Sequence, residues 1–263
     1  MTYLKIVEQI KTMKNNLPKI CYWCGIELTP SSIKREHVPP KGFFPKGFKK
    51  DLMTVPSCEK HNNNFSKLDE KFQFYLKSHR SNSAAENDFL DTVLRGLKRK
   101  EKQSFVNSFN KNTGIGFINE KPTIFSKLEP FEADTFIEKI IRALYFYHKE
   151  KPAEGMIQWF SKHIHFGGID SNSFVDSFKE DLDERILTRG EFNNPEVFQY
   201  RYIDVQGTFG LFLDFYEGIE FIGWVLPKGF TYDNFNPEKH GYTEEKLYEI
   251  NNKNKVIYPN FNK

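Results

Sequence analysis

The sequence of 263 residues predicts an α+β protein with antiparallel strands. Three observations lead to this prediction. The three cysteines and one histidine form two short pairs within the first quarter of the chain. An apolar stripe with helical spacing begins after Asp134. Strand-like runs follow, and the last two are separated by the turn signal Glu217-Gly218. We therefore expect a small N-terminal module followed by a larger α+β domain.

The composition is that of a globular chain, with 38% hydrophobic and 28% charged residues and 27 Phe available for a core. No apolar run approaches the roughly 20 residues needed to cross a bilayer, so we expect no membrane contact. Residues 1–16 carry charges among their apolar positions, which predicts a short amphipathic helix and not a signal peptide. We expect a cytoplasmic location, where the odd number of cysteines would stay reduced.

Two pairs of side chains predict a metal site. Cys21 and Cys24 form a C-x2-C knuckle, with Gly25 allowing a tight turn, and Cys58 and His61 form a C-x2-H pair. Four such ligands match tetrahedral Zn²⁺ in number and type. The alternative is that the cysteines are buried apolar side chains and His61 caps a helix. We expect the metal site, because one site accounts for every cysteine of the chain.

The segment between the pairs predicts two strands. Residues 33–38 precede Pro39-Pro40, which ends a strand, and residues 52–55 precede Pro56. After the second pair, apolar residues recur at helical spacing; they are Phe65, Leu68, Phe72, Tyr75 and Leu76. The local order is therefore strand, loop, strand, helix.

This order, together with CYWCG, EHVPPKGFFPKGF and TVPSCEKHNNNFSKLDEKF, resembles the HNH endonuclease family and its ββα-metal (treble-clef-like) fold. The likeness is to the zinc-clipped bacterial subgroup and covers about residues 18–78. It places the first histidine of the family motif on His37 and the last position on Asn62. The fourth zinc ligand is His61 where the subgroup has cysteine, and the middle asparagine of the motif has no counterpart near Met53.

The chemistry follows from the residues as well. Phosphodiester hydrolysis needs a base to activate water and a cation to neutralise charge. His37 is the only histidine between the two pairs, and we expect it to be the base. Glu36 and Asn62 offer hard oxygen ligands for Mg²⁺ or Mn²⁺. A regular strand would point Glu36 and His37 to opposite faces, so we expect a bend before Pro39-Pro40. The alternative for Asn62 is that it is a capping or turn residue, which is the role we expect for the following Asn63 and Asn64.

The charge pattern favours a polyanionic partner. Residues 34–67 contain eight basic and three acidic residues, a net +5, while the whole chain is +3. We expect Lys34, Arg35 and Lys41 to bind phosphate. A second basic run, residues 95–102, either extends this track or is the exposed end of a helix.

The remaining elements are assigned by periodicity and turn signals. Residues 84–108 read as helix, 113–133 as a linker with a short hairpin, and the segment from Asp134 to Glu150 as a helix capped by Asp134 or Thr135. Strands are expected within residues 156–160, 197–205, 208–216 and 219–227. His163 and His165 are interpreted as ordinary strand residues.

Three segments are therefore expected: 1–80 as the HNH nuclease module with its N-terminal helix, 81–130 as helix and linker, and 131–263 as an α+β domain. The predicted function is metal-dependent endonuclease action on DNA, with structural Zn and catalytic Mg or Mn. The alternative is a non-catalytic, zinc-stabilised module that binds nucleic acid or another protein. The C-terminal domain is expected to recognise substrate, a protein partner or a second copy of the chain.

Overall fold

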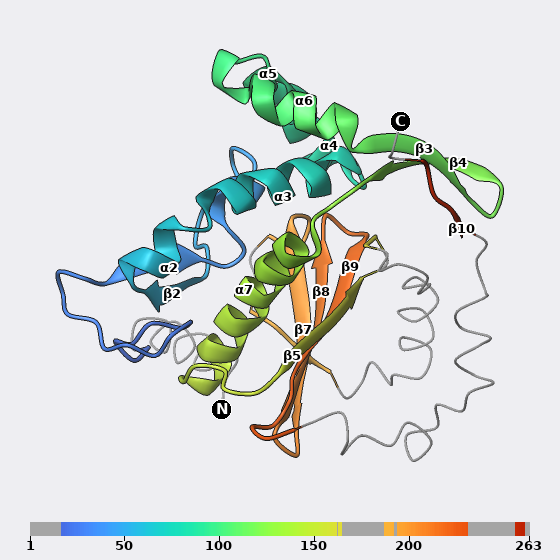
Figure 1. Ribbon diagram of the computed structural model, residues 1–263. Coiled ribbons are helices and arrows are strands. Elements are labelled where there is room, and N and C mark those ends of the chain that lie inside the picture. Colours follow the sequence, from blue (N-terminus) through green and yellow to red (C-terminus); the bar gives the residue numbers. More distant parts are fainter. Residues whose placement is uncertain (1–16, 162, 165–186, 192–193, 231–255, 261–263) are drawn as a thin grey trace, which may run out of the picture.

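The computed structural model describes residues 17–161, 163–164, 187–191, 194–230 and 256–260. The expected N-terminal helix, His165 and most of the tail after Thr231 lie outside the described residues. The described part is mixed α+β, and all its strand pairs are antiparallel, as predicted (Figure 1). No helix in these ranges is long and apolar enough to cross a membrane.

The N-terminal module has the expected order of elements. Strands β1 (Lys34–His37) and β2 (Thr54–Ser57) form a two-stranded sheet, joined by a loop that contains the 3-10 helix η1 (Lys41–Phe43). Helices α2 (Glu59–Asn63) and α3 (Ser66–Ser78) follow. Pro56 does not end the second strand as expected. It pairs with Arg35, because a two-stranded sheet leaves each strand with a free edge that tolerates proline.

The middle of the chain is helical and then turns back in a hairpin, as expected. The elements are α4 (Ser83–Asp88), the π-helix η2 (Phe89–Val93), α5 (Leu94–Leu97), the 3-10 helix η3 (Lys100–Lys102) and α6 (Gln103–Lys111). Strands β3 (Thr113–Ile118) and β4 (Lys121–Ser126) then pair, and β10 (Val256–Ile257) adds to β3. This small sheet projects away from the larger one (Figure 1).

Helix α7 (Pro130–Lys149) begins four residues before the expected start. Its first residue is Pro130, where a missing N–H costs nothing because the first amides of a helix have no partner inside it. Asp134 therefore does not cap the helix. Its Oδ1 instead accepts a hydrogen bond of 3.0 Å from Trp159 Nε1, which ties the helix to β5.

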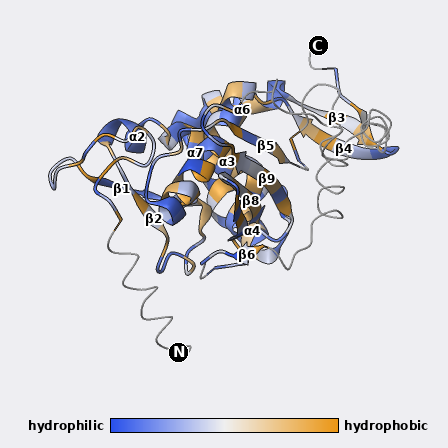
Figure 2. Cartoon of the chain, turned by 90° about the horizontal axis from the view of Figure 1, so that it is seen from below, coloured by the Kyte–Doolittle hydropathy of each residue, from blue (hydrophilic) through white to orange (hydrophobic). Residues whose placement is uncertain are grey.

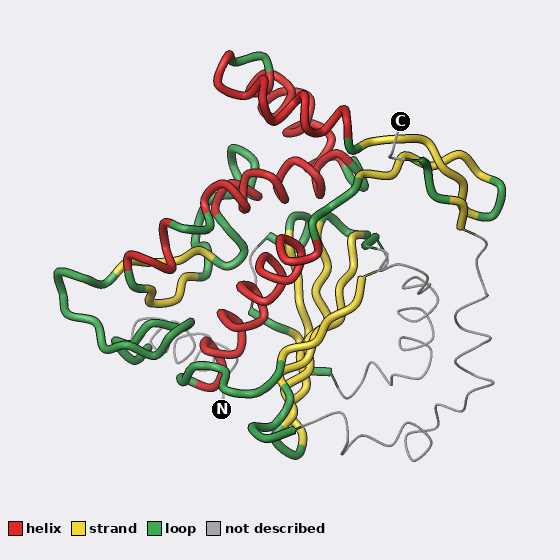
Figure 3. The backbone as a smooth tube through the Cα atoms, in the orientation of Figure 1, coloured by secondary structure: helices red, strands yellow, loops and turns green. Residues whose placement is uncertain are grey.

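The larger sheet has five strands in the order β5-β9-β8-β7-β6. They are β5 (Ile157–Ser161), β6 (Thr188–Arg189), β7 (Phe198–Val205), β8 (Thr208–Phe215) and β9 (Ile219–Val225). Helix α7 runs across one face of this sheet (Figure 3). Gly223 permits the close approach, since a Cβ at that position would lie 2.4 Å from Ile141 Cδ1.

One hydrophobic core extends across the expected boundaries at residues 80 and 131. The ring of Phe136 on α7 stacks on Phe72 of α3 at 4.2 Å and on Phe43 at 5.5 Å. Phe43 also contacts Phe215 of β8 at 5.9 Å. Orange, hydrophobic segments accordingly occur in both α3 and α7 and in the sheet (Figure 2). The division of the chain into segments 1–80, 81–130 and 131–263 stays a prediction. The hydrophobic core contains residues of both the first and the last of these segments.

A half-buried histidine of α7 gives the fold an expected pH dependence. His148 Nε2 lies 2.9 Å from Tyr200 Oη, and its ring packs on Tyr202 at 4.1 Å. Burial lowers the pKa of His148 from 6.5 to about 4, and Asp204 opposes this only in part. In the unfolded chain the imidazole takes up a proton at a higher pH. The stabilising contribution is therefore complete above pH 6.5 and is lost as the pH falls toward 4.

We expect the parent to lose about 2 kcal/mol more stability than His148→Gln between pH 7 and 4.5. Urea unfolding at the two pH values measures the difference, and comparison with the variant cancels the titration of all other groups. Equal losses in the two proteins would show that His148 is not the titrating group.

Candidate metal centre and adjoining pocket

The two predicted ligand pairs come together in one cluster. Cys21 and Cys24 lie in the turn between Ile20 and Glu27, which form an isolated antiparallel bridge. Cys58 is the N-cap of α2, and His61 lies within that helix. The ligand atoms of all four residues lie within 4.8 Å of one another.

The geometry fits a tetrahedral metal ion. His61 Nδ1 is 3.2 Å from Cys58 Sγ and 3.6 Å from Cys21 Sγ. Zinc bonds of about 2.3 Å to sulfur and about 2.0 Å to nitrogen would separate neighbouring ligands by about 3.5–3.8 Å. Burial raises the pKa of Cys21, but backbone hydrogen bonds from Cys24, Cys58 and Trp23 outweigh it and lower the pKa overall. The cluster could therefore hold a metal ion such as zinc.

Aromatic stacking attaches this cluster to the rest of the fold. The His61 ring stacks on Trp23 with centroids 5.7 Å apart, and Trp23 also contacts Phe65 at 5.1 Å. Arg142 of α7 lies over the Trp23 ring at 5.1 Å. The cluster thus orients α2 and α3 against α7 as well as closing its own turn.

A pocket of about 410 Å³ lies beside the cluster, between β1, the η1 loop and helices α2 and α3. Its walls include Glu36, His37 and Asn62, the three residues predicted to be catalytic. Other lining residues are Arg35, Lys41, Ser66, Asp69, Glu70 and Gln73. Glu36 and His37 are adjacent on β1 and nevertheless line the same pocket, as the expected bend requires.

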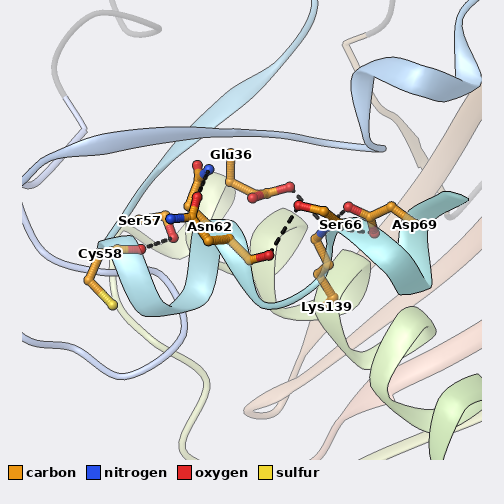
Figure 4. Close-up of polar contacts among 8 residues, drawn as sticks. Glu36, Ser57, Cys58, Asn62, Ser66, Asp69 and Lys139 are labelled. Carbon is orange, nitrogen blue, oxygen red and sulfur yellow. Dashed lines mark hydrogen bonds and ion pairs between the residues drawn. The ribbon is translucent and has the colours of Figure 1, made fainter. Parts of the chain in front are cut away.

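Behind one wall of the pocket lies a lysine, missed by sequence reasoning, that forms ion pairs with two of the lining residues. Lys139 of α7 is 1% exposed, and its Nζ lies 2.9 Å from Glu36 Oε1. The same Nζ lies 2.8 and 2.7 Å from the two carboxylate oxygens of Asp69 on α3. These contacts are drawn in Figure 4. The available signal was the place of this lysine on the apolar stripe of the helix, three residues after Phe136 and four before Ala143.

The environment shifts the pKa values of the pocket residues in different directions. Burial lowers the pKa of His37, and Lys41 lowers it further, so the imidazole is neutral near pH 7. Burial raises the pKa of Glu36 and Asp69, and the Lys139 ammonium opposes the rise in both. A neutral imidazole and a pair of carboxylates held by one lysine therefore share the pocket.

Two of the three predicted phosphate-binding residues are placed at the pocket. Arg35 and Lys41 are exposed and line it, whereas Lys34 is exposed on β1 but is not among the lining residues. The neighbouring asparagines do not cap a helix with their side chains. Asn64 is the C-cap residue of α2, and Asn63 accepts a hydrogen bond from Ser66 Oγ through its backbone carbonyl.

Comparisons of the chain with protein-family models, with curated proteins and with solved structures gave no match. What the protein does is therefore inferred from the cluster and the pocket themselves.

Proposed function

We propose that the chain is a metal-dependent endonuclease of the HNH type, which hydrolyses phosphodiester bonds in DNA. The carrying observation is that Glu36, His37 and Asn62 line one pocket. The β1–β2 hairpin and helix α2 that bear them adjoin the Cys3His cluster. In this proposal the hairpin, the helix and a structural zinc form a ββα-metal module.

Each residue has a separate role in the proposed reaction. His37 accepts a proton from the attacking water. Glu36 and Asn62 supply oxygen ligands suited to Mg²⁺ or Mn²⁺, which when bound would neutralise charge on the phosphate and leaving oxygen. Arg35 and Lys41 hold the phosphate backbone at the pocket mouth.

A second candidate is a zinc-stabilised module that binds nucleic acid without cutting it. The ion pair between Glu36 and Lys139 favours this alternative, because a cation of the protein already occupies one oxygen of the predicted metal ligand. The exposed Arg35 and Lys41 serve either function.

Plasmid cleavage distinguishes the two functions. Incubation of supercoiled plasmid with the purified protein and Mg²⁺ or Mn²⁺ is expected to give nicked or linear DNA, and EDTA should prevent it. Zinc content and DNA binding by gel shift are measured on the same preparation. A zinc-loaded protein that retards DNA but leaves it uncut with either metal supports the binding module and excludes the nuclease.

Replacing Asn62 should change the metal requirement of cleavage. Asn62→Ala removes one oxygen ligand, so we expect cleavage to fall and to recover in part at higher Mn²⁺, which such ligands bind more tightly than Mg²⁺. Asn64→Ala is the matched control, since Asn64 is an exposed residue of the same run that does not line the pocket. Asn63 is unsuitable, because its Oδ1 accepts a hydrogen bond of 3.5 Å from Asn62 Nδ2. If the two variants have the same metal dependence, Asn62 is not a ligand.

A further inference from the structure

The strongest unexplained feature is the placement of a fully buried lysine behind the pocket. Lys139 is not a lining residue, but both of its carboxylate partners are. Its ammonium group contacts one oxygen of Glu36 and both oxygens of Asp69. No hydrogen bond occupies the second oxygen of Glu36 in the described part of the chain. Lys139 therefore contacts the two carboxylates on the side away from the pocket, while Glu36 and Asp69 themselves line the pocket.

The charges of this group do not balance. Two carboxylates and one ammonium leave one negative charge when both acids are ionised. Arg35 and Lys41 line the same pocket, yet neither forms an ion pair with Glu36 or Asp69 among the described residues. An uncompensated buried charge is costly unless another cation neutralises it. The group is thus suited to receive a further cation from the pocket side.

The three residues come from three separate elements. Glu36 lies on β1, Asp69 on α3 and Lys139 on α7. The Phe65 ring covers the ammonium group at 5.2 Å, and Lys139 has almost no exposed surface. One ammonium group thus contacts both carboxylates, at 2.9 Å to Glu36 Oε1 and 2.7 Å to Asp69 Oδ2, in a place that solvent hardly reaches.

We propose that Glu36 and Asp69 together bind one divalent cation, and that Lys139 is a positioning residue of the pocket, which fixes the geometry in which the two carboxylates hold that cation. This inference rests on the proposed nuclease function and adds Asp69 to the ligands named above. Lys139 itself touches neither the substrate nor the cation. It sets the position of Glu36, and Asp69 supplies the excess negative charge.

Two substitutions separate these roles. Asp69→Asn removes the excess charge but leaves the Glu36–Lys139 ion pair. We expect its Mn²⁺ dissociation constant to rise at least about tenfold, with a cleavage rate at saturating Mn²⁺ close to that of the parent. Lys139→Met keeps both carboxylates but frees Glu36. We expect undiminished Mn²⁺ affinity and a saturating rate at least about tenfold lower, because small displacements at a reacting centre are costly.

The measurements are Mn²⁺ binding by calorimetry, cleavage rate against Mn²⁺ concentration, and melting temperature. Lys71→Met is the control, because the Lys71–Glu132 ion pair also joins α3 to α7 but does not involve the two carboxylates. The control is expected to match the parent in Mn²⁺ affinity and in saturating rate. A merely structural role for Lys139 and Asp69 would weaken affinity and rate together, in step with the melting temperature.

The outcomes are distinct. If Lys139→Met cuts at the parent's saturating rate, or if both variants lose affinity in parallel with stability, the positioning role is overturned while the nuclease function stands. If Lys139→Met does not fold, the Asp69→Asn variant provides the test. An Mn²⁺ affinity of Asp69→Asn equal to that of the parent overturns the inference. A weaker Mn²⁺ affinity with the parent's cleavage rate at saturating Mn²⁺ supports it. If the parent neither binds Mn²⁺ nor cuts DNA, the proposed function falls and this inference with it.

Discussion

Removing metal from the Cys21–Cys24–Cys58–His61 cluster is expected to lower the melting temperature by at least about 10 °C. Binding of structural zinc in small modules is worth on the order of 10 kcal/mol, and that free energy contributes directly to folding. Helix α2 buries no residue and strand β1 buries only Glu36, so these two elements have little core of their own. Their loss would also expose the aromatic core around Phe72 and Phe136, so the effect should reach the whole chain.

A pair of substitutions at His61 separates the metal from its packing. His61→Ala removes the ligand and the stacking on Trp23, whereas His61→Cys removes the stacking but keeps a zinc ligand. We expect one zinc per chain in the parent and in His61→Cys by elemental analysis, and none held tightly by His61→Ala. Two results would contradict a structural metal site. One is a parent protein that is purified without chelator and contains no zinc. The other is a His61→Ala protein with the same melting temperature as the parent.

His37→Ala is expected to reduce DNA cleavage by on the order of a hundredfold or more. A general base contributes mainly in the transition state, so DNA binding and zinc content should change little. His37 is only half-buried, and among the described residues its ring makes no hydrogen bond, so we expect only a small change in stability. The readouts are cleavage rate, gel shift, zinc content and melting temperature.

His79→Ala provides the control for this substitution. His79 lies at the end of α3, packs against His163 and is not part of the pocket. It should cut at the parent rate. If His37→Ala does so too, His37 is not the base and the proposed mechanism loses its central residue.

Several features of the fold and site could be read from the sequence because they depend on neighbours along the chain. The strand-like runs and the Glu217-Gly218 turn predicted the hairpin that strands β8 and β9 form in the larger sheet. The scarcity of cysteine predicted that all three would meet with His61, and the structure brings them within reach of one ion. The start of α7 was misplaced, because proline at the first helical position was interpreted as part of a linker.

The construction of the pocket depended on tertiary structure. The sequence by itself determined an α+β chain, a four-ligand cluster and three pocket residues, Glu36, His37 and Asn62. Only the packing of α7 against α3 and β1 placed Lys139 between Glu36 and Asp69. Those three residues are separated by 33 and 70 positions along the chain, and no periodicity links them. The electrostatic attraction within an ion pair is strong only where the pair is buried. Which side chains are buried depends on which face of a helix packs against which strand.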